Sequence, residues 1–180
     1  STGLRIVAVK KFAMTVAQAE AFYGPVEQAL ATKFPMFGAA RVAAAVAREL
    51  GVEVSEAEAG PLCQALAAKF ARGQFEQIVE FMTGYKPSAV PPGEKAVRAG
   101  ADSLALIYEG ENAVAKIRDI LGATDPTKAR PGSIRREFGT NIMINAAHAS
   151  DSPENARREM GIIDIFGDNM SPFIKKHCYE

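Results

Sequence analysis

The sequence predicts an α+β fold in which helices cover one face of a small sheet. Residues 4–9 and 103–108 are short, apolar, β-rich runs that are typical of strands, and helical stretches opened by capping signals separate and follow them. The chain has 180 residues, of which 48% are hydrophobic and 23% are charged, enough for one domain with a sizeable core. We therefore expect residues 1–180 to form a single domain.

The first helix is predicted to follow the strand at residues 4–9. Thr15 and Gln18 form a capping-box pattern that opens a helix to about Tyr23. Beyond residue 24 the sequence becomes rich in alanine, and residues 41–50 have helical character up to Gly51, a residue that commonly ends helices.

A second capping box, Ser55 with Glu58, opens a further helix. Residues 25–70 are therefore predicted to be mainly helical. The apolar stripe that follows has helical spacing and favours core packing over a binding role. It consists of Phe75, Ile78, Val79 and Met82.

The second half of the chain begins with a segment, residues 85–101, that is rich in proline, glycine and lysine and is expected to be a loop. The strand at 103–108 and an amphipathic helix at 112–121 follow, and Gly122 ends that helix. The run before His148, residues 140–144, has the composition of a short strand.

His148 is predicted to lie on a tight link between this strand and a helix. Ser152 can cap free amides, Pro153 suits the first helical position, and Glu154 complements the positive end of the helix dipole. An imidazole among small, hydrogen-bonding residues can act as a nucleophile, although a single histidine is more often structural.

Three arginines lie in the loop before this link. Arg130, Arg135 and Arg136 fall within seven positions, between proline and glycine residues that indicate a loop. Clustered guanidinium groups suit phosphate because their planar donors can bind two oxygens at once. A solvated basic loop is an equally good interpretation of the composition alone.

Together the two segments resemble a known family. Residues 130–138 (RPGSIRREF), followed by Asn145-x-x-His148-Ala149-Ser150-Asp151-Ser152, are similar to the signature of the nucleoside diphosphate kinases. The family has glycine where this chain has Ala149. The resemblance extends to residues 104–126, which look like the family's strand, helix and phosphate-contacting loop. Residues 14–23 look like the end of its second strand and the helix that follows, and residues 72–82 look like its nucleotide-clamping hairpin.

This resemblance implies a ferredoxin-like, four-stranded antiparallel sheet with extra helices, and a homo-oligomer, either a hexamer or a tetramer. Compared with the family, the chain is long at about 25–70 and at about 85–101, so we interpret these segments as a helical insertion and a loop insertion. The chain also starts at what resembles the second strand.

The family's first strand carries a phosphate-binding lysine. We expect this strand to come from residues upstream of Ser1 or from a separate polypeptide segment, because a sheet without a central strand exposes unpaired backbone groups. The alternative is that residues 4–10 serve as the first strand, with Lys10 or Lys11 in place of that lysine.

The resemblance also implies a reaction. The γ-phosphate of a nucleoside triphosphate would pass to His148 and then to a nucleoside diphosphate, by a ping-pong route through a phosphohistidine. Glu159 matches the carboxylate that binds the other ring nitrogen, and Ser150 is a second residue that could orient the ring. Mg²⁺ is implied as a bridge between phosphate oxygens, without a full protein cage of ligands.

The resemblance further implies a set of nucleotide contacts. They are Arg72, Gln74, Ile78, Arg118, Thr124, Arg135, Ile142 and Asn145, with Tyr23 as a supporting residue. Gln74 stands where the family usually has an aromatic side chain, although Phe75 is adjacent. An inactive or weakly active nucleotide-binding or assembly module is therefore the alternative to an enzyme. The intact His148, Asn145 and Glu159 favour the enzyme.

Composition gives the remaining expectations. The chain has 21 basic and 21 acidic residues, so its overall charge does not indicate a nucleic-acid or membrane partner. Cys63 and Cys178 have no metal-site spacing, and the sequence shows neither a signal peptide nor an apolar run of about 18 residues. A reduced, cytoplasmic setting is expected, although the two cysteines could still form a disulfide.

Overall fold

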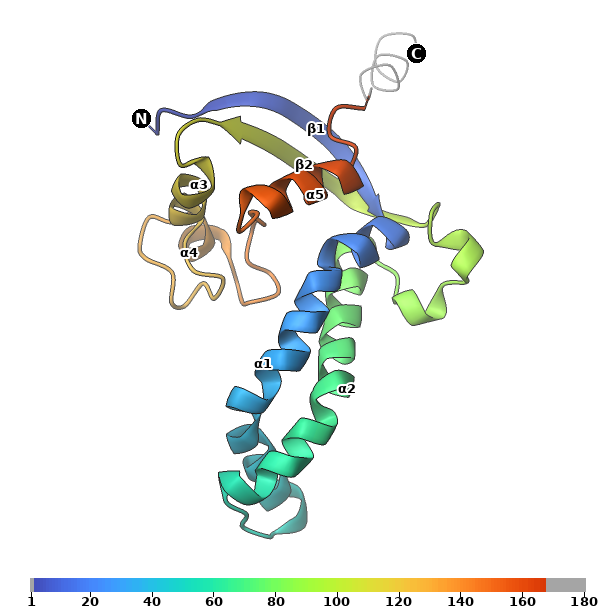
Figure 1. Cartoon of the computed structure of the whole chain (residues 1–180), viewed down its shortest axis with the longest axis vertical. Coiled ribbons are helices and arrows are strands. Elements are labelled where there is room, and N and C mark those ends of the chain that lie inside the picture. Colours follow the sequence, from blue (N-terminus) through green and yellow to red (C-terminus); the bar gives the residue numbers. More distant parts are fainter. Residues whose placement is uncertain (1, 168–180) are drawn as a thin grey trace. The chain divides into compact units, whose positions relative to one another are not determined.

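The computed structural model describes residues 2–167 of the chain (Figure 1). It contains two compact units. One unit is Met14–Ala101, and the other combines the segment up to Ala13 with the segment from Asp102 onward. Among the described residues, none of the helices combines the length and the apolar character needed to cross a membrane.

The unit Met14–Ala101 is built mainly from two long helices, α1 (Val16–Leu50) and α2 (Glu56–Thr83), which lie side by side (Figure 1). Both predicted capping boxes are confirmed, at Thr15 for α1 and at Ser55 for α2. Gly51 ends α1 in the left-handed conformation with φ 67°, which glycine adopts without steric cost. These local signals determine where the helices begin and where α1 ends.

The predicted end of the first helix near Tyr23 is wrong, because α1 continues through Pro25 and Pro35 to Leu50. Proline inside a helix removes a backbone hydrogen bond and costs about 3 kcal/mol. Long-range packing against α2 accompanies this continuation. Phe34, next to the second proline, is 5% exposed, and its ring stacks on that of Phe70 with centroids 4.0 Å apart.

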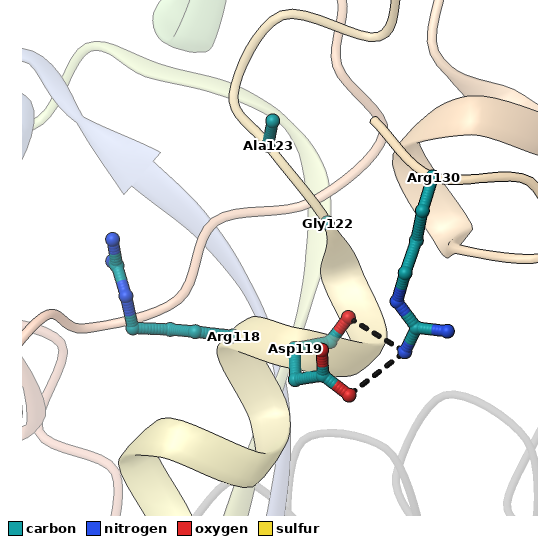
Figure 2. A pocket seen from close by; sticks show the side chains of 5 residues that line it. All are labelled: Arg118, Asp119, Gly122, Ala123 and Arg130. Carbon is teal, nitrogen blue, oxygen red and sulfur yellow. Dashed lines mark hydrogen bonds and ion pairs between the residues drawn. The ribbon is translucent and has the colours of Figure 1, made fainter. Parts of the chain in front are cut away.

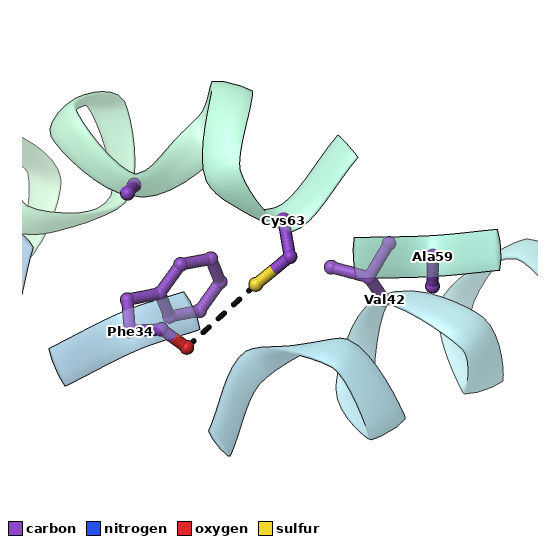
Figure 3. Packing of buried hydrophobic residues seen from close by; sticks show 5 residues of the cluster. Phe34, Val42, Ala59 and Cys63 are labelled. Carbon is purple, nitrogen blue, oxygen red and sulfur yellow. Dashed lines mark hydrogen bonds between the residues drawn. The ribbon is translucent and has the colours of Figure 1, made fainter. Parts of the chain in front are cut away.

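The core between these helices combines one phenylalanine with small and medium-sized side chains. Its buried members are Phe34, Val42, Ala59, Cys63 and Ala67 (Figure 3). Gly38 allows the close approach, since a Cβ there would lie 2.6 Å from Sγ of Cys63. Cys63 is a buried free thiol whose Sγ lies 3.6 Å from the carbonyl oxygen of Phe34.

After α2 the predicted loop contains two short 3-10 helices, η1 (Pro87–Ala89) and η2 (Pro92–Glu94), before a strand begins at Ala99. Phe75 and Val79 from the apolar stripe of α2 are buried, as the interpretation of this stripe as core predicts.

The arrangement of residues 1–180 as one domain, with insertions at 25–70 and 85–101, stays a prediction.

The sheet has two strands in the described chain, β1 (Arg5–Thr15) and β2 (Ala99–Glu109). Arg5 forms an ion pair with Glu109 at 2.7 Å, and Lys11 forms one with Asp102 at 2.7 Å, so the strands run antiparallel. Both predicted strands are therefore confirmed, and each is longer than predicted.

The predicted strand at residues 140–144 is wrong, because this segment is a turn that belongs to no strand. Oδ1 of Asn141 accepts hydrogen bonds from the amides of Met143 and Ile144, both at 2.9 Å. The amide of Thr140 donates to the carbonyl of Ile144 at 2.7 Å. An asparagine side chain that binds nearby amides offers the backbone an alternative to strand pairing.

Both lysines that could replace the family's phosphate-binding lysine have a partner in the same unit. Nζ of Lys10 donates to the carbonyl of Asp164, and Lys11 forms the ion pair with Asp102. The supply of a further strand by another segment stays a prediction.

Three helices complete the second unit: α3 (Ala113–Leu121), α4 (Ile134–Phe138) and α5 (Pro153–Ile162). Gly122 ends α3 with φ 83°, and Oγ of Ser152 caps α5 by accepting from the amide of Asn155 at 3.1 Å, both as predicted. Residues 139–152 connect α4 to α5 and carry His148, so α5 starts directly beside the predicted nucleophile.

Candidate active site

His148, Ser150 and Glu159 meet through one carboxylate oxygen. Oε2 of Glu159 lies 3.0 Å from Nε2 of His148 and accepts a hydrogen bond from Oγ of Ser150 at 2.6 Å. Glu159 is buried in α5, whereas the His148 side chain is 44% exposed. The contacts expected of Glu159 and Ser150 are thus present, with the imidazole open to solvent.

The environment of Glu159 keeps its carboxyl group ionised. Burial raises the pKa of Glu159, but hydrogen bonds from His148 and Ser150 and the charges of His148 and Arg158 outweigh burial, so its pKa lies below the ordinary value. An ionised carboxylate only accepts hydrogen bonds, so Nε2 of a neutral His148 is the nitrogen that carries the proton. The lone pair of the ring therefore lies on Nδ1.

Two charged side chains near this cluster, Arg158 and Asp151, were not among the expected site residues. Nη2 of Arg158 lies 3.2 Å from Oε1 of Glu159. The hydrogen bond from Asn155, at 2.6 Å, lowers the pKa of Asp151, and the charges of Arg118 and His148 lower it further. The position of Asp151 directly before the helix cap Ser152 is the sequence signal that points to it.

Arg135 is buried, with 8% of its surface exposed, and binds backbone carbonyls. Its Nε and Nη2 donate to the carbonyl of Ala147 at 3.2 and 2.9 Å, and its Nη1 donates to the carbonyl of Gly122 at 2.9 Å. Burial lowers the pKa of Arg135, and the nearby charge of Arg118 lowers it further. The arginine predicted to contact phosphate therefore also links α3 to the His148 segment.

The other two arginines of the predicted cluster also have partners within the protein, Arg130 in α3 and Arg136 in the loop. Nη2 of Arg130 donates to the carboxylate of Asp119 at 2.8 Å and to its carbonyl at 3.2 Å, and Nη1 of Arg136 donates to the carbonyls of Pro126 and Thr127. Arg130 and Arg136 are exposed, and Arg135 is buried, so the choice between a solvated basic loop and a phosphate-binding loop stays a prediction.

A hollow of about 380 Å³ lies at the end of α3. It is lined by Arg118, Asp119, Gly122, Ala123 and Arg130 (Figure 2). Figure 2 shows the exposed Arg118 side chain extending away from the Asp119–Arg130 ion pair. Thr124, also exposed, follows the lining residue Ala123 in the chain. Arg118 and Thr124 are thus accessible to an anionic ligand.

Asn145 and Ile142 lie in the turn before His148. Nδ2 of Asn145 donates to the carbonyl of Ile142 at 2.9 Å, so the amide helps to shape this turn. The Ile142 side chain is 63% exposed, which leaves apolar surface beside the site.

The remaining predicted residues, Arg72, Gln74, Ile78 and Tyr23, belong to the unit Met14–Ala101. Arg72 forms ion pairs with Glu27 at 3.6 Å and Glu76 at 3.4 Å. Nε2 of Gln74 donates to Gln77 at 3.3 Å. The structure therefore brings these four residues into one unit and the His148 cluster into the other.

Phe75 is not a substitute for the aromatic side chain that Gln74 lacks. Its ring is only 2% exposed, and the guanidinium carbon of Arg72 lies 5.2 Å from the ring centroid. A buried ring cannot stack on a base without repacking the core.

Within residues 2–167, no group of three or more histidine, cysteine or acidic side chains could hold a metal ion.

Comparison with known proteins identifies the family. The sequence profile of the family described as nucleoside diphosphate kinase matches residues 44–168. The nucleoside diphosphate kinase of Halalkalibacterium halodurans is 51% identical over 65 residues, which are 36% of this chain and 42% of that protein. The nucleoside diphosphate kinase of Bdellovibrio bacteriovorus is 41% identical over 92 residues, which are 51% of this chain and 54% of that protein. The chain thus spans about half the length of the curated relatives it matches.

Solved structures agree with this assignment. The nucleoside diphosphate kinase of Aquifex aeolicus aligns with 93% of this chain and 77% of its own, at a TM-score of 0.52 and 28% identity. An NDP kinase from Pyrobaculum aerophilum aligns with 89% of this chain and 79% of its own, at a TM-score of 0.56 and 26% identity. The matched segment, residues 44–168, makes up more than half of the sequence, and the chain belongs to the nucleoside diphosphate kinase family.

Proposed function

We propose that this chain transfers the terminal phosphate of a nucleoside triphosphate to a nucleoside diphosphate through a phosphohistidine at His148. The observation that carries the proposal is the contact of 3.0 Å between Nε2 of His148 and the ionised carboxylate of Glu159. This contact makes Nδ1 the nucleophilic nitrogen of the neutral ring.

The proposed reaction consists of two phosphoryl transfers. In the first, the Nδ1 lone pair attacks the γ-phosphorus, the bond between this phosphorus and the bridging oxygen breaks, and a nucleoside diphosphate leaves. In the second, a terminal oxygen of the acceptor diphosphate attacks the phosphorus of the phosphohistidine, the bond between Nδ1 and this phosphorus breaks, and a nucleoside triphosphate leaves the neutral ring. The Glu159 carboxylate supports the first step, because the ring gains positive charge as the new bond forms.

Phosphoryl transfer depends chiefly on positioning and on neutralising the charge of the phosphate oxygens. We assign this role to Arg118, which is exposed at the end of α3, with Thr124 and Asn145 as further contacts. The resemblance to the family implies Arg72 as one more phosphate contact. Arg135 has two N–H groups beyond the three that bind carbonyls, and these suit the same purpose. Gln74, Ile78 and Ile142 would meet the base, and Tyr23 would act in support.

Mg²⁺ arrives as part of the nucleotide substrate, bound to its phosphate oxygens. The proposal includes a homo-oligomer, as in the family, and a cytoplasmic setting. The buried free thiol of Cys63 fits a reducing compartment, whereas Cys178 and His177 lie outside the described residues.

Labelling with [γ-³²P]ATP and Mg²⁺ tests the function. The expected result is an acid-labile phosphate on the protein that is absent in His148→Ala, is present in His177→Ala, and passes to added GDP to give labelled GTP. Nucleotide binding without any labelled protein would instead favour a non-catalytic nucleotide-binding or assembly module. Equal labelling of wild type and His148→Ala would reject His148 as the nucleophile.

A further inference from the structure

Arg135 binds the backbone of two segments, one at the end of α3 and one directly before His148. Two of its N–H groups meet the carbonyl of Ala147 and a third meets the carbonyl of Gly122. The guanidinium is a planar fork that holds its partners in a fixed geometry, which a lysine cannot reproduce. The side chain is therefore committed to the shape of the segment that carries His148.

The carbonyl of Ala147 belongs to the peptide group that leads into His148. A peptide group is planar, so holding this oxygen also fixes the amide nitrogen of His148 and the direction of its Cα. The preceding residue, Ala146, has φ 74°, and the amide of Ala147 donates to the carbonyl of Asn145 at 3.0 Å. This pattern matches the rare and strained form of the γ-turn.

A strained turn persists only where its surroundings hold it in place. Arg135 binds the Ala147 carbonyl directly after the turn. The same guanidinium also binds the carbonyl of Gly122, which lies in a closely packed part of the unit. A Cβ at Gly122 would lie 2.5 Å from Oγ of Ser133, so the end of α3 is closely packed against the start of α4. The peptide before His148 is thus tied to a rigid part of the unit.

We propose that Arg135 is a positioning residue for the nucleophile, because it fixes the Ala147–His148 peptide and thereby keeps the imidazole on Glu159. This inference rests on the proposed function for its catalytic meaning, but its effect on the ring is tested in protein without nucleotide. It adds to the phosphate contact proposed above, and it makes a different prediction for protein without nucleotide.

The test uses the full chain, labelled with ¹⁵N in histidine, at pH 8 and without nucleotide. Arg135→Met removes all the donors of the side chain, Arg135→Lys restores a charge and a smaller set of donors, and Arg136→Met is the matched control. Arg136 lies on the same helix and binds the carbonyls of Pro126 and Thr127, away from Ala147. The ring nitrogen signals of His148, assigned with His148→Ala, report which nitrogen carries the proton.

We expect a single tautomer protonated at Nε2 in wild type and in Arg136→Met, a mixture in Arg135→Met, and partial recovery in Arg135→Lys. Phosphoramidate serves as a nucleotide-free donor. Its P–N bond breaks as the phosphoryl group joins Nδ1, and ammonia leaves. Phosphorylation of His148 by this donor should slow roughly tenfold in Arg135→Met, the effect of one lost hydrogen bond to a charged group. If Arg135→Met does not fold, Arg135→Lys decides by the same two measurements.

Unchanged ring signals and an unchanged phosphoramidate rate in the folded Arg135 variants would overturn the proposal. If nucleotide affinity nevertheless fell in these variants, Arg135 would be a phosphate contact alone. If wild-type His148 accepted phosphate from neither ATP nor phosphoramidate, the proposed function would fail. The ring signals of the nucleotide-free variants would still decide whether Arg135 positions His148.

Discussion

The carboxylate of Glu159 lies 3.0 Å from Nε2 of His148 although the two residues are 11 positions apart in the sequence. The contact forms because Ser152 caps α5 just after the His148 segment, and Glu159 then lies on that helix facing back toward the ring. The same carboxylate oxygen holds Ser150 at 2.6 Å. The orientation of His148 therefore depends on a residue that also organises its neighbour.

Replacing Glu159 by glutamine should slow the phosphorylation of His148 by ATP. A neutral amide still fits the site but no longer stabilises the developing positive charge, and the loss of a charged partner costs on the order of 1 kcal/mol, or roughly fivefold in rate. Rapid-quench single-turnover kinetics measure this rate. Glu154→Gln, on the exposed side of the same helix, is the control. Equal slowing in both variants would remove the special role of Glu159.

Stability should depend on pH through Glu159. Its pKa is lowered in the folded protein relative to its ordinary value of 4.5, so the ionised form stabilises the fold above that value, and this stabilisation is lost as the pH falls through the folded-state pKa. Urea unfolding at pH 7 and at pH values below 4.5 should show a smaller difference in Glu159→Gln than in wild type. The exposed Glu111, changed to glutamine, should leave the difference unchanged. A full pH response in Glu159→Gln would contradict the linkage.

Arg118→Ala should weaken binding of ATP with Mg²⁺ and slow phosphoenzyme formation. The substitution removes an exposed guanidinium from the hollow at the end of α3, and a charge-assisted contact contributes on the order of 1.5–3 kcal/mol. Isothermal titration calorimetry gives the affinity. Lys116→Ala, a cation on the same helix outside the lining of the hollow, should have a much smaller effect. Matching affinities for the two variants would mean that phosphate does not bind at Arg118.

Gly38→Ala should destabilise the helix pair by about 1–3 kcal/mol, since the new methyl group would press on Sγ of Cys63 at 2.6 Å and on the Phe34 ring at 2.8 Å. Gly73→Ala is the matched control on α2, where a Cβ meets no atom within 4 Å, and it should stabilise by about 0.5–1 kcal/mol. Thermal unfolding followed by circular dichroism compares them. Equal shifts in the same direction would show that the helices are not closely packed at Gly38.

Replacing residues 25–68 by a short linker should change stability or assembly more than the chemistry at His148, because this helical segment contains no histidine. Light scattering reports assembly, and phosphoramidate labelling reports the reactivity of His148. A trimmed protein that folds and assembles but no longer binds nucleotide would show that the segment forms part of the site.

Much of the local structure could be predicted because its cause lies within a few residues. The capping boxes at Thr15 and Ser55, the cap at Ser152 and the helix stops at Gly51 and Gly122 each depend on a side chain or a backbone angle at that position. The candidate site residues could be named because their types and spacing carry the family signature. The same signature gave no account of what Arg135 binds.

The sequence by itself predicted that His148 and Glu159 belong to one site, and their side chains are in contact. It also predicted where most of the helices begin. Only the tertiary structure decided that α1 continues through Pro25 and Pro35 and that Arg135 is buried against backbone carbonyls. These outcomes depend on contacts between distant parts of the chain, such as the Ala147 carbonyl with the Arg135 guanidinium. Such contacts form only after the segments meet, and their free energies exceed the local preferences that the sequence displays.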